Sequence, residues 1–443
     1  MSHASIVAAL QSRWPEHRVA PTLGRIEALC DLMGEPQRSY GVIQVAGTNG
    51  KGSTAIMIDA LLRSMGLRTG RVSSPHLVDV TERICIDGQP ISAELFDETW
   101  AAIEPLVQLV DERRIDGVEM TFFEVITGMA FAAFADAPVD VAIVEVGLGG
   151  TWDATNVADA QVAVICPIDL DHTHILGKTV AEIAGEKAGI IKPGAHAILA
   201  GQQPEAAAVL LARCAEVGAL PHREGIDFGL LERQVAIGGQ LLRLNGADGP
   251  VGELFLPLHG AHMAQNAALA LAAVEAFAGL RALSAEVIAD GFADVVAPAR
   301  LELARTSPPI VIDTAHNPHG ARATMSALDE AFAFAPLIGV VAMMADKDVE
   351  GVLRVFADEM SAIVATQVSS TGRGLSAERL AEVAGGMIGD DRVSAVPAMA
   401  DAIEEAVRLA DEAGPGAGIL IAGSVIAAGE ARALLVPAKA ETS

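Results

Sequence analysis

The chain is poor in aromatic residues and in basic ones. Phe, Trp and Tyr make up 4% of its 443 residues, so its core has to be built mainly from Ala, Val, Leu and Ile. Lys and Arg number 30 against 57 Asp and Glu, which gives a formal net charge of −27. A general binder of nucleic acid or of an anionic membrane needs a net positive surface, so neither partner is expected. The negative net charge still allows an anionic small-molecule substrate, provided that local cations or a metal ion bind it.

Long apolar runs and paired cysteines are also missing. The longest segment without Asp, Glu, Lys or Arg, residues 254–274, contains Pro257, His259, Gln265 and Asn266, which makes it a poor membrane-spanning helix. Residues 1–15 show no basic region followed by an apolar stretch, so we expect no secretory signal. The four cysteines are scattered without a Cys-x-x-Cys pair, which predicts reduced thiols and a cytoplasmic protein.

Short apolar runs alternate with amphipathic runs along the first part of the chain. The expected strands are residues 41–46, 138–146 and 161–166, and the expected helices are residues 53–65, 124–135, 180–190 and 262–280. This alternation predicts an α/β fold with a mainly parallel sheet. Residues 226–256 differ, because glycine turns separate their short runs and indicate a small antiparallel excursion.

A second α/β series begins near Pro298. Its expected strands are residues 309–313, 337–343, 362–365 and 418–422. A chain of 443 residues is longer than one core usually organises. We therefore expect a P-loop-type parallel-sheet ATPase domain at residues 1–296 and a smaller Rossmann-like α/β domain at residues 297–443, with a hinge at residues 297–299.

A glycine-rich loop separates the strand at residues 41–46 from the following helix. Its sequence is Gly47-Thr48-Asn49-Gly50-Lys51-Gly52-Ser53-Thr54. At such a place, backbone N–H groups and the helix N-terminus can cradle phosphate oxygens. Lys51 would reach the outer phosphates, and Ser53 or Thr54 could contact nucleotide or metal. The loop departs from the strict GxxxxGK[ST] pattern, since Val45 holds the first glycine position and Gly52 follows the lysine. An ordinary glycine turn is the structural alternative.

The loop resembles the ATP loop of the Mur ligase superfamily, and the blocks around it resemble the folylpolyglutamate synthase/dihydrofolate synthase family. The matching blocks, in chain order, are residues 24–26, 36–37, 73–77, 82–84, 121–124, 145–150, 153–156, 171–173, 175–177, 186–190, 266, 300–302, 313, 315–318 and 346–348. Each block alone is weak. Their joint order, from about residue 22 to residue 432, is highly specific.

Magnesium chemistry is expected at the ends of the strands. Glu145 ends an apolar strand and His172 follows the next one, and ligands in open α/β sheets collect at that edge. Oxygen ligands with few nitrogens suit magnesium. The resemblance implies that Ser74, Glu145 and His172 bind magnesium, and that Lys187 is carbamylated and helps to hold a second ion. The alternatives are a structural carboxylate at Glu145, a zinc pair of His172 and His174, and an ordinary exposed lysine at position 187.

The resemblance also assigns the nucleotide clamp. It implies that Asn266 meets the adenine side of ATP, Arg300 the phosphates and Asp313 the ribose, so that ATP lies across both domains. His316 and Ser424 are weaker candidates for positioning the incoming glutamate. The structural alternatives are a helix-face amide at Asn266, a turn cap at Asp313, and surface or turn roles for His316 and Ser424.

The acceptor side is read from two further blocks. By resemblance, its candidate residues are Thr121, Phe122, Phe123, Glu124, Trp152, Asp153 and Ala154. Thr151 and Trp152 stand where the family often has Arg-Leu, so a cation is lost near the expected pterin pocket and an indole is gained. Trp152 either stacks on a flat heterocycle or fills core. Thr314 replaces a usual glycine, and residues 344–345 before Asp346 also differ. These departures affect substrate preference more than ATP chemistry.

These features predict an ATP-dependent carboxylate–amine ligase. The γ-phosphoryl group would pass to a substrate carboxylate, and the amine of L-glutamate would attack the acyl phosphate. Such chemistry depends on positioning and charge neutralisation, for which we expect Lys51, Glu145, His172, Lys187, Arg300 and magnesium. The resemblance implies dihydropteroate and folate mono- or polyglutamates as acceptors, and a monomer.

Two other functions stay open. One is a Mur-type ligase for another carboxylic acid, although the roughly 40 residues before the loop leave little room for the uridine-nucleotide domain of a cell-wall ligase. The other is a nucleotide-binding protein without ligation chemistry. The retained Glu145, His172 and Lys187 disfavour it.

Overall fold

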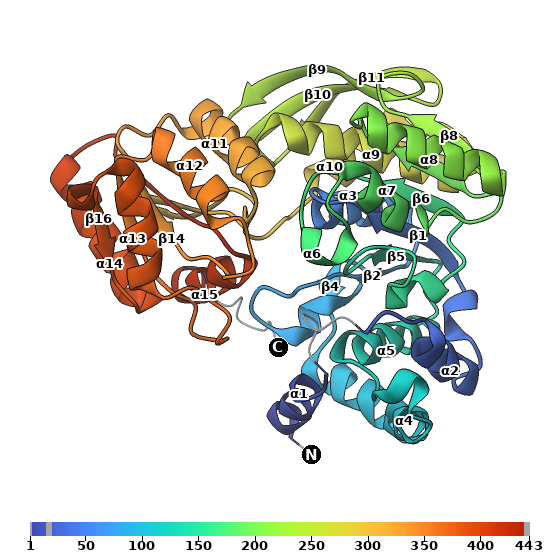
Figure 1. Ribbon diagram of the computed structural model, residues 1–443. Helices are drawn as coiled ribbons and strands as arrows, with labels where there is room; N and C mark the ends of the chain where they lie inside the picture. The colour runs from blue at the N-terminus through green and yellow to red at the C-terminus, as the bar shows by residue number, and fades with distance from the viewer. Residues whose placement is uncertain (1, 15–19, 438–443) are drawn as a thin grey trace. The chain divides into compact units, whose positions relative to one another are not determined.

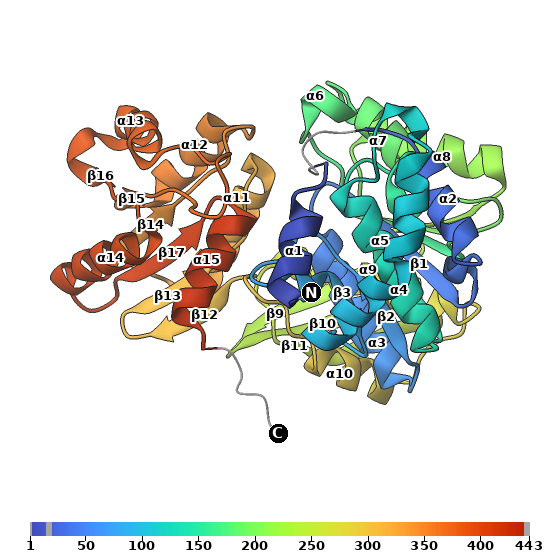
Figure 2. The ribbon, with the colours of Figure 1, turned by 90° about the horizontal axis from the view of Figure 1, so that it is seen from below.

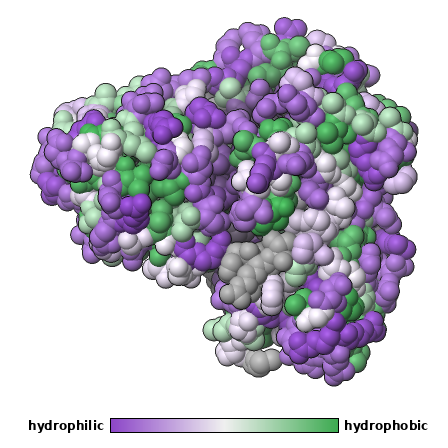
Figure 3. Space-filling model, viewed as in Figure 1, coloured by the Kyte–Doolittle hydropathy of each residue, from purple (hydrophilic) through white to green (hydrophobic). Residues whose placement is uncertain are grey.

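The computed structural model describes residues 2–14 and 20–437, which form two compact units (Figure 1). The first unit takes in most of the chain up to Val295. The second contains the chain from Val296 onward together with Gln234–Gln240 and Pro257–Met263. No helix among the described residues is long and apolar enough to span a bilayer. On the face drawn in Figure 3, hydrophilic side chains predominate and apolar ones are scattered, as expected for a charged surface.

An eight-stranded sheet organises the first unit, in the order β4-β3-β2-β5-β1-β6-β7-β8. The strands are β1 (Gly41–Ala46), β2 (Thr69–Val72), β3 (Ile84–Ile86), β4 (Gln89–Pro90), β5 (Val141–Glu145), β6 (Val162–Ile165), β7 (His196–Leu199) and β8 (Leu220–Arg223). From β2 to β8 all neighbours are parallel, whereas β3 and β4 are antiparallel additions. The carboxyl ends of β2, β5, β1 and β6 therefore share one edge.

Helices cover both faces of this sheet. They are α1 (His3–Gln11), α2 (Gly24–Leu32), α3 (Lys51–Ser64), α4 (Ala93–Glu112), α5 (Phe122–Asp136), α6 (Thr173–Leu176), α7 (Val180–Ala188), α8 (Pro204–Val217), α9 (Ala261–Phe277) and α10 (Ala285–Ala293). Helices α2, α4 and α5 enclose one apolar core, and α7 and α8 enclose another on the same face. Figure 2 shows α3 and α10 together on the opposite side. The α7–α8 core has only aliphatic and cysteine residues among its buried members, whereas the core under α2, α4 and α5 also contains Tyr40, Phe96, Trp100, Phe122, Phe131 and Phe134.

A three-stranded sheet follows in the chain, in the order β11-β10-β9. Its strands are β9 (Gly229–Ala236), β10 (Gly239–Gly246) and β11 (Gly249–Leu256). Two-residue connections join successive strands, and only antiparallel neighbours can be joined so tightly. The antiparallel excursion expected from the glycine turns is confirmed.

The second unit is built on a six-stranded sheet in the order β12-β13-β17-β14-β15-β16. Its strands are β12 (Glu302–Thr306), β13 (Pro309–Ile312), β14 (Leu337–Val341), β15 (Ala362–Ala365), β16 (Val393–Ala395) and β17 (Gly418–Ala422). All pairs are parallel except β12 with β13. The helices are α11 (Pro318–Phe332), α12 (Val349–Glu359), α13 (Ala377–Ile388), α14 (Met399–Ala413) and α15 (Val425–Leu435). The expected two-domain α/β class with parallel-rich sheets is confirmed.

Candidate active site

The glycine-rich segment follows β1 and opens α3, as predicted, and the helix begins at Lys51, two residues before the expected start. Gly47 and Gly50 have φ of 152° and 85°, and a Cβ at Gly50 would lie 2.9 Å from Oδ1 of Asn266. Asn266 therefore lies against the loop. The Lys51 ammonium donates to the carbonyl oxygen of Gly47 at 3.1 Å. Thr48 ties the loop to the segment after β6, because its hydroxyl bonds the carbonyl oxygen of Asp169 at 3.0 Å.

Glu145 lies at the carboxyl end of β5, directly opposite Val45 of β1, and is buried. Ser74 follows β2, which pairs with β5 on its other side, so both residues leave the sheet at the same edge. Arg71 lies on β2, the strand that precedes Ser74. Its burial alone would lower the pKa of this guanidinium, but Cys85, Asp59 and Glu145 raise it. A largely buried cation thus acts on the Glu145 carboxylate.

Lys187 is buried in the last turn of α7 with 4% of its surface exposed. The alternative of an ordinary exposed lysine is therefore wrong. Burial, and next the positive charge of Lys51, lower the pKa of the Lys187 amine to about 7, although Asp171 and Asp153 oppose the shift. The turn after Glu145 packs directly on this residue, since a Cβ at Gly150 would lie 3.0 Å from its Cα.

His172 has a φ of 49° and caps the N-terminus of α6. Its ring centroid lies 6.4 Å from that of His174, and its Nε2 lies 3.9 Å from a carboxylate oxygen of Asp171. Across residues 2–14 and 20–437, no group of three or more His, Cys, Asp and Glu is arranged to hold a metal ion. The described structure thus offers the His172–His174 pair no further zinc ligands of these types.

Three of the acceptor-side candidates bond to the protein itself, and one of them is Glu124, whose carboxylate accepts from the Thr121 amide at 2.7 Å. The Thr121 hydroxyl caps α5 by accepting from the Glu124 amide at 3.2 Å. Asp153 accepts from the Leu148 amide at 2.9 Å and from the Thr155 amide at 3.0 Å. Burial raises the pKa of this carboxyl, against the effect of these hydrogen bonds. These side chains hold the backbone in place.

The aromatic candidates lie in different surroundings. The Phe123 ring packs against Gly147, where a Cβ would lie 2.6 Å from its Cζ, and part of Phe123 stays exposed. The guanidinium of Arg83 lies over the ring of Phe122, with its Cζ 4.9 Å from the ring centroid. Ala154 is buried in the short helix that follows Asp153. Trp152 packs at the margin of the α7–α8 core, which favours its core-filling alternative.

The second-unit candidates gather at the carboxyl ends of β13 and β17. Asp313 is buried and accepts from the Leu301 amide at 3.0 Å and the Ala315 amide at 2.8 Å. The Arg300 guanidinium donates to the hydroxyl of Thr314, the residue that replaces the usual glycine. His316 bonds the Thr314 carbonyl oxygen at 2.9 Å. Ser424 caps α15 through the Ile426 amide at 3.1 Å, in agreement with a turn role.

Several supporting residues received no role from the sequence. Arg25, Arg71, Gln44 and Thr155 are charged or polar side chains that are buried or nearly so and that hydrogen-bond to other residues of the first unit. Gln44 lies inside the apolar strand β1, where a lone polar residue is a usable signal, whereas Arg71 lies in β2, whose sequence Thr-Gly-Arg-Val offers no such contrast. Arg25 belongs to a block that matches the family, but its burial is invisible without the partner that it meets.

Comparison with known proteins gives matches along nearly the whole chain. Residues 45–274 match the Mur ligase middle domain, and residues 299–425 match the Mur ligase glutamate ligase domain. The dihydrofolate synthase/folylpolyglutamate synthase of Mycobacterium tuberculosis is 48% identical over 96% of this chain and 92% of its own. The protein of the same name from Escherichia coli is 35% identical, over 86% of each chain.

Solved structures agree. The Mycobacterium tuberculosis folylpolyglutamate synthase complexed with ADP superposes with a TM-score of 0.95, over 98% of each chain at 48% identity. A complex of a folylpolyglutamate synthase (FPGS) with AMPPCP and folate superposes with a TM-score of 0.84 at 32% identity, over 99% of this chain and 100% of that one.

Proposed function

Because this chain belongs to the Mur ligases, in the family of dihydrofolate synthases and folylpolyglutamate synthases, we propose that it adds L-glutamate to both dihydropteroate and folate glutamates at the expense of ATP. It is a carbon–nitrogen ligase of the acid–amino-acid class. The observation that carries the substrate proposal is the meeting, at one sheet edge, of the phosphate loop, the buried Glu145 and the turn against which Phe123 packs.

ATP would bind at the loop of residues 47–54, with Lys51 and Arg300 receiving phosphate charge. Asn266 lies beside Gly50, which supports a place for it at the nucleotide. Asp313 would act by holding Leu301 and Ala315, the neighbours of Arg300 and His316. We keep His316 as a residue that positions the incoming glutamate.

The donors at the edge suit magnesium. Ser74, Glu145 and His172 would hold one ion, since a hard cation prefers such oxygen-rich sets. Bound there, magnesium would neutralise phosphate charge and assist phosphoryl transfer. Lys187 fits a second site as a carbamate. An amine with a pKa of about 7 is substantially neutral at that pH and can attack CO₂, forming an N–C bond and releasing one proton.

The test of the function is phosphate release from ATP and magnesium with L-glutamate, comparing dihydropteroate with a reduced folate as acceptor. Release with both acceptors is expected, and Lys51→Ala or Glu145→Ala should abolish it. Nucleotide binding without release on either acceptor would contradict the proposal.

We further propose that residues 1–296 and 297–443 are the functional domains of a cytoplasmic monomer. Light scattering of the purified chain tests the monomer.

The carbamate has its own test. In Lys187→Arg the guanidinium stays protonated near pH 7 and cannot form a carbamate. We therefore expect kcat to fall by about 100-fold or more. Lys187→Ala should lose as much and regain part of its rate in acetate, which offers a carboxylate to the same space. A Lys187→Arg enzyme with the wild-type rate would contradict the carbamate.

A further inference from the structure

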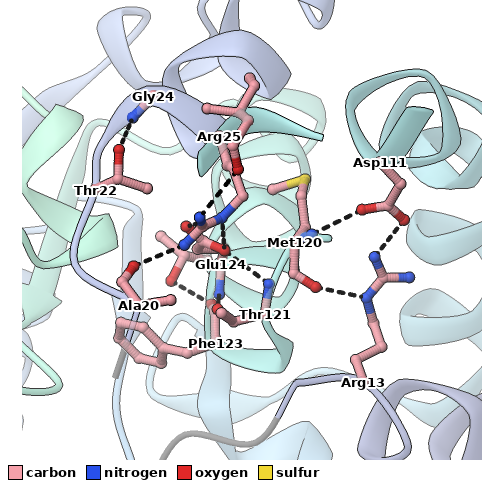
Figure 4. A network of polar contacts seen from close by, with 12 residues as sticks. Arg13, Ala20, Thr22, Gly24, Arg25, Asp111, Met120, Thr121, Phe123 and Glu124 are labelled. Carbon is pink, nitrogen blue, oxygen red and sulfur yellow. Dashed lines mark hydrogen bonds and ion pairs between the residues drawn. The ribbon is translucent and has the colours of Figure 1, made fainter. Parts of the chain in front are cut away.

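An ion pair lies inside the first unit at the start of α5. Arg25 and Glu124 are 1% and 4% exposed. The Nε of Arg25 lies 3.1 Å and 3.0 Å from the two carboxylate oxygens of Glu124, and its Nη2 donates to the Ala20 carbonyl oxygen at 2.7 Å. Figure 4 shows the guanidinium between Ala20 and Glu124. Both charges are thus removed from water and satisfied inside the protein.

The pair fixes the backbone that carries Phe123. One Glu124 oxygen accepts from the Thr121 amide at 2.7 Å, while the Thr121 hydroxyl accepts from the Glu124 amide, which completes a capping box. Phe123 lies between these two residues, and its ring packs against Gly147. A movement of Glu124 would therefore displace the Phe123 ring.

A second set of bonds holds the residue before the cap. Asp111 accepts from the Met120 amide at 2.7 Å and also binds Arg13, whose Nε donates to the Met120 carbonyl oxygen at 3.0 Å (Figure 4). The Phe122 amide donates to the carbonyl oxygen of Trp14 at 3.2 Å. The start of α5 is thus tied to the N-terminal segment at several points, and the Arg25–Glu124 pair holds the residue that directly follows Phe123.

Stability alone does not account for this pair. Two charges taken out of water carry a desolvation cost, and neutral residues of similar volume are often at least as stabilising. Arg25 also lies in the first turn of α2, the end where the helix dipole disfavours a cation. A buried ion pair in this unfavourable place indicates a geometric role.

We propose that Arg25 and Glu124 are a positioning pair that sets the affinity of the site for its aromatic acceptor. They would act through Phe123 and would not touch the acceptor themselves. This inference rests on the proposed function, because it takes the partly exposed Phe123 ring as a wall of the acceptor site.

The test is the double variant Arg25→Met/Glu124→Gln. Glutamine keeps the length of the side chain and can still accept from the Thr121 amide, while both charges are removed together. The control is Arg408→Met/Glu405→Gln, which removes an exposed ion pair of 2.7 Å on α14 by the same substitutions. KM for dihydropteroate, ATP and L-glutamate and the thermal unfolding midpoint are measured for the wild type and both variants.

We expect KM for dihydropteroate to rise about tenfold or more in the double variant, since small displacements of positioning groups have large effects. KM for ATP and for L-glutamate should change less than about twofold, and the unfolding midpoint should fall no further than in the control. An unchanged acceptor KM, or an equal rise in all three KM values, overturns the inference. If the double variant does not fold, Glu124→Gln alone is judged by the same criteria. A wild type without ligation contradicts the proposed function, whereas a ligating wild type with an unaffected variant contradicts the positioning pair alone.

Discussion

Three buried polar residues connect β1 with the turn that follows Glu145. Gln44 donates to the Thr155 hydroxyl at 3.0 Å, which bonds the Asp153 carboxylate at 2.5 Å. Asp153 in turn accepts from the Leu148 amide. The Thr155 hydroxyl thus accepts one hydrogen bond and donates another. Its loss would leave the buried Gln44 amide without this acceptor, while the Asp153 carboxylate would keep the Leu148 and Thr155 amides as donors.

Thr155→Val should therefore destabilise the first unit by about 1–3 kcal/mol, which is the usual cost of one unsatisfied buried polar group. Thr155→Ser keeps the hydroxyl and is the matched control. The shift of the chemical unfolding midpoint measures the difference. Equal midpoints for the two variants would show that the hydroxyl does not hold this chain of bonds.

At this scale the sequence identified polar residues but not their partners. The sequence predicted that Thr121 and Asp153 contact the acceptor substrate, yet the hydrogen bonds described for them lie within the protein. From the helix sequence around it alone, Lys187 is predicted to be exposed. It is buried because α7 packs against Gly150. Motif spacing reports which atoms are available, whereas pairing depends on tertiary contacts.

The phosphate loop offers a paired test at the scale of an element. Gly50 and Gly66 have nearly equal φ values of 85° and 81°, but a Cβ at Gly50 would meet Asn266 and one at Gly66 would meet nothing within 4 Å. Alanine at either site bears the backbone strain of about 1 kcal/mol. Only Gly50→Ala should also weaken ATP binding, by about tenfold or more. Titration of both variants with ATP measures their affinities. Equal affinities of Gly50→Ala and Gly66→Ala for ATP would contradict the assignment of the loop as the ATP-binding site.

Strands β7 and β8 carry a histidine pair. His196 Nδ1 lies 2.9 Å from His222 Nε2, and their ring centroids are 5.2 Å apart. Burial, and then the electrostatic effect of the neighbouring His196, lower the pKa of His222, although Asp227 opposes them. A lowered folded pKa favours the neutral ring, so its stabilisation is present above the unfolded pKa of about 6.5 and is lost on acidification.

The thermal midpoint of the wild type should therefore fall further between pH 7 and pH 5 than that of His222→Gln, by about 1–3 °C. Differential scanning calorimetry at the two pH values provides the comparison. Parallel falls in the two proteins would mean that the pair does not titrate as described.

Element prediction succeeded where apolar runs are continuous and failed where a partner changes the pattern. Strands β1 and β17 coincide with their expected ranges. Strand β2 was missed, because its sequence Thr-Gly-Arg-Val has no apolar run. Gly70 there gives room for the Phe134 ring, and Arg71 is neutralised by Asp59 at 3.5 Å. Neither compensation is visible from β2 alone.

At the scale of the whole molecule, the net charge of −27 opposes the binding of polyanions. Each glutamate added to a folate brings further negative charge. Raising NaCl from about 20 to about 200 mM shortens the screening length, so it should lower KM for a triglutamylated folate relative to that for dihydropteroate. Steady-state kinetics at the two salt concentrations measure this ratio. A ratio that is constant or rises would show that local cations outweigh the overall charge.

The two-domain α/β architecture and the order of its motifs were predictable, because aliphatic strands and glycine turns are local signals. The distribution of the chain between two units was not, since Gln234–Gln240 and Pro257–Met263 join a unit whose main part starts at Val296. Such assignment depends on packing between segments that are distant in sequence.

The order of strands in the large sheet has one more consequence. Its outermost strands, β4 and β8, each contain a proline, Pro90 and Pro221. Proline has no amide hydrogen to offer a neighbouring strand, and edge strands of this kind resist pairing with other chains. A sheet whose inner strands are mainly aliphatic is in this way kept from acting as a template for aggregation.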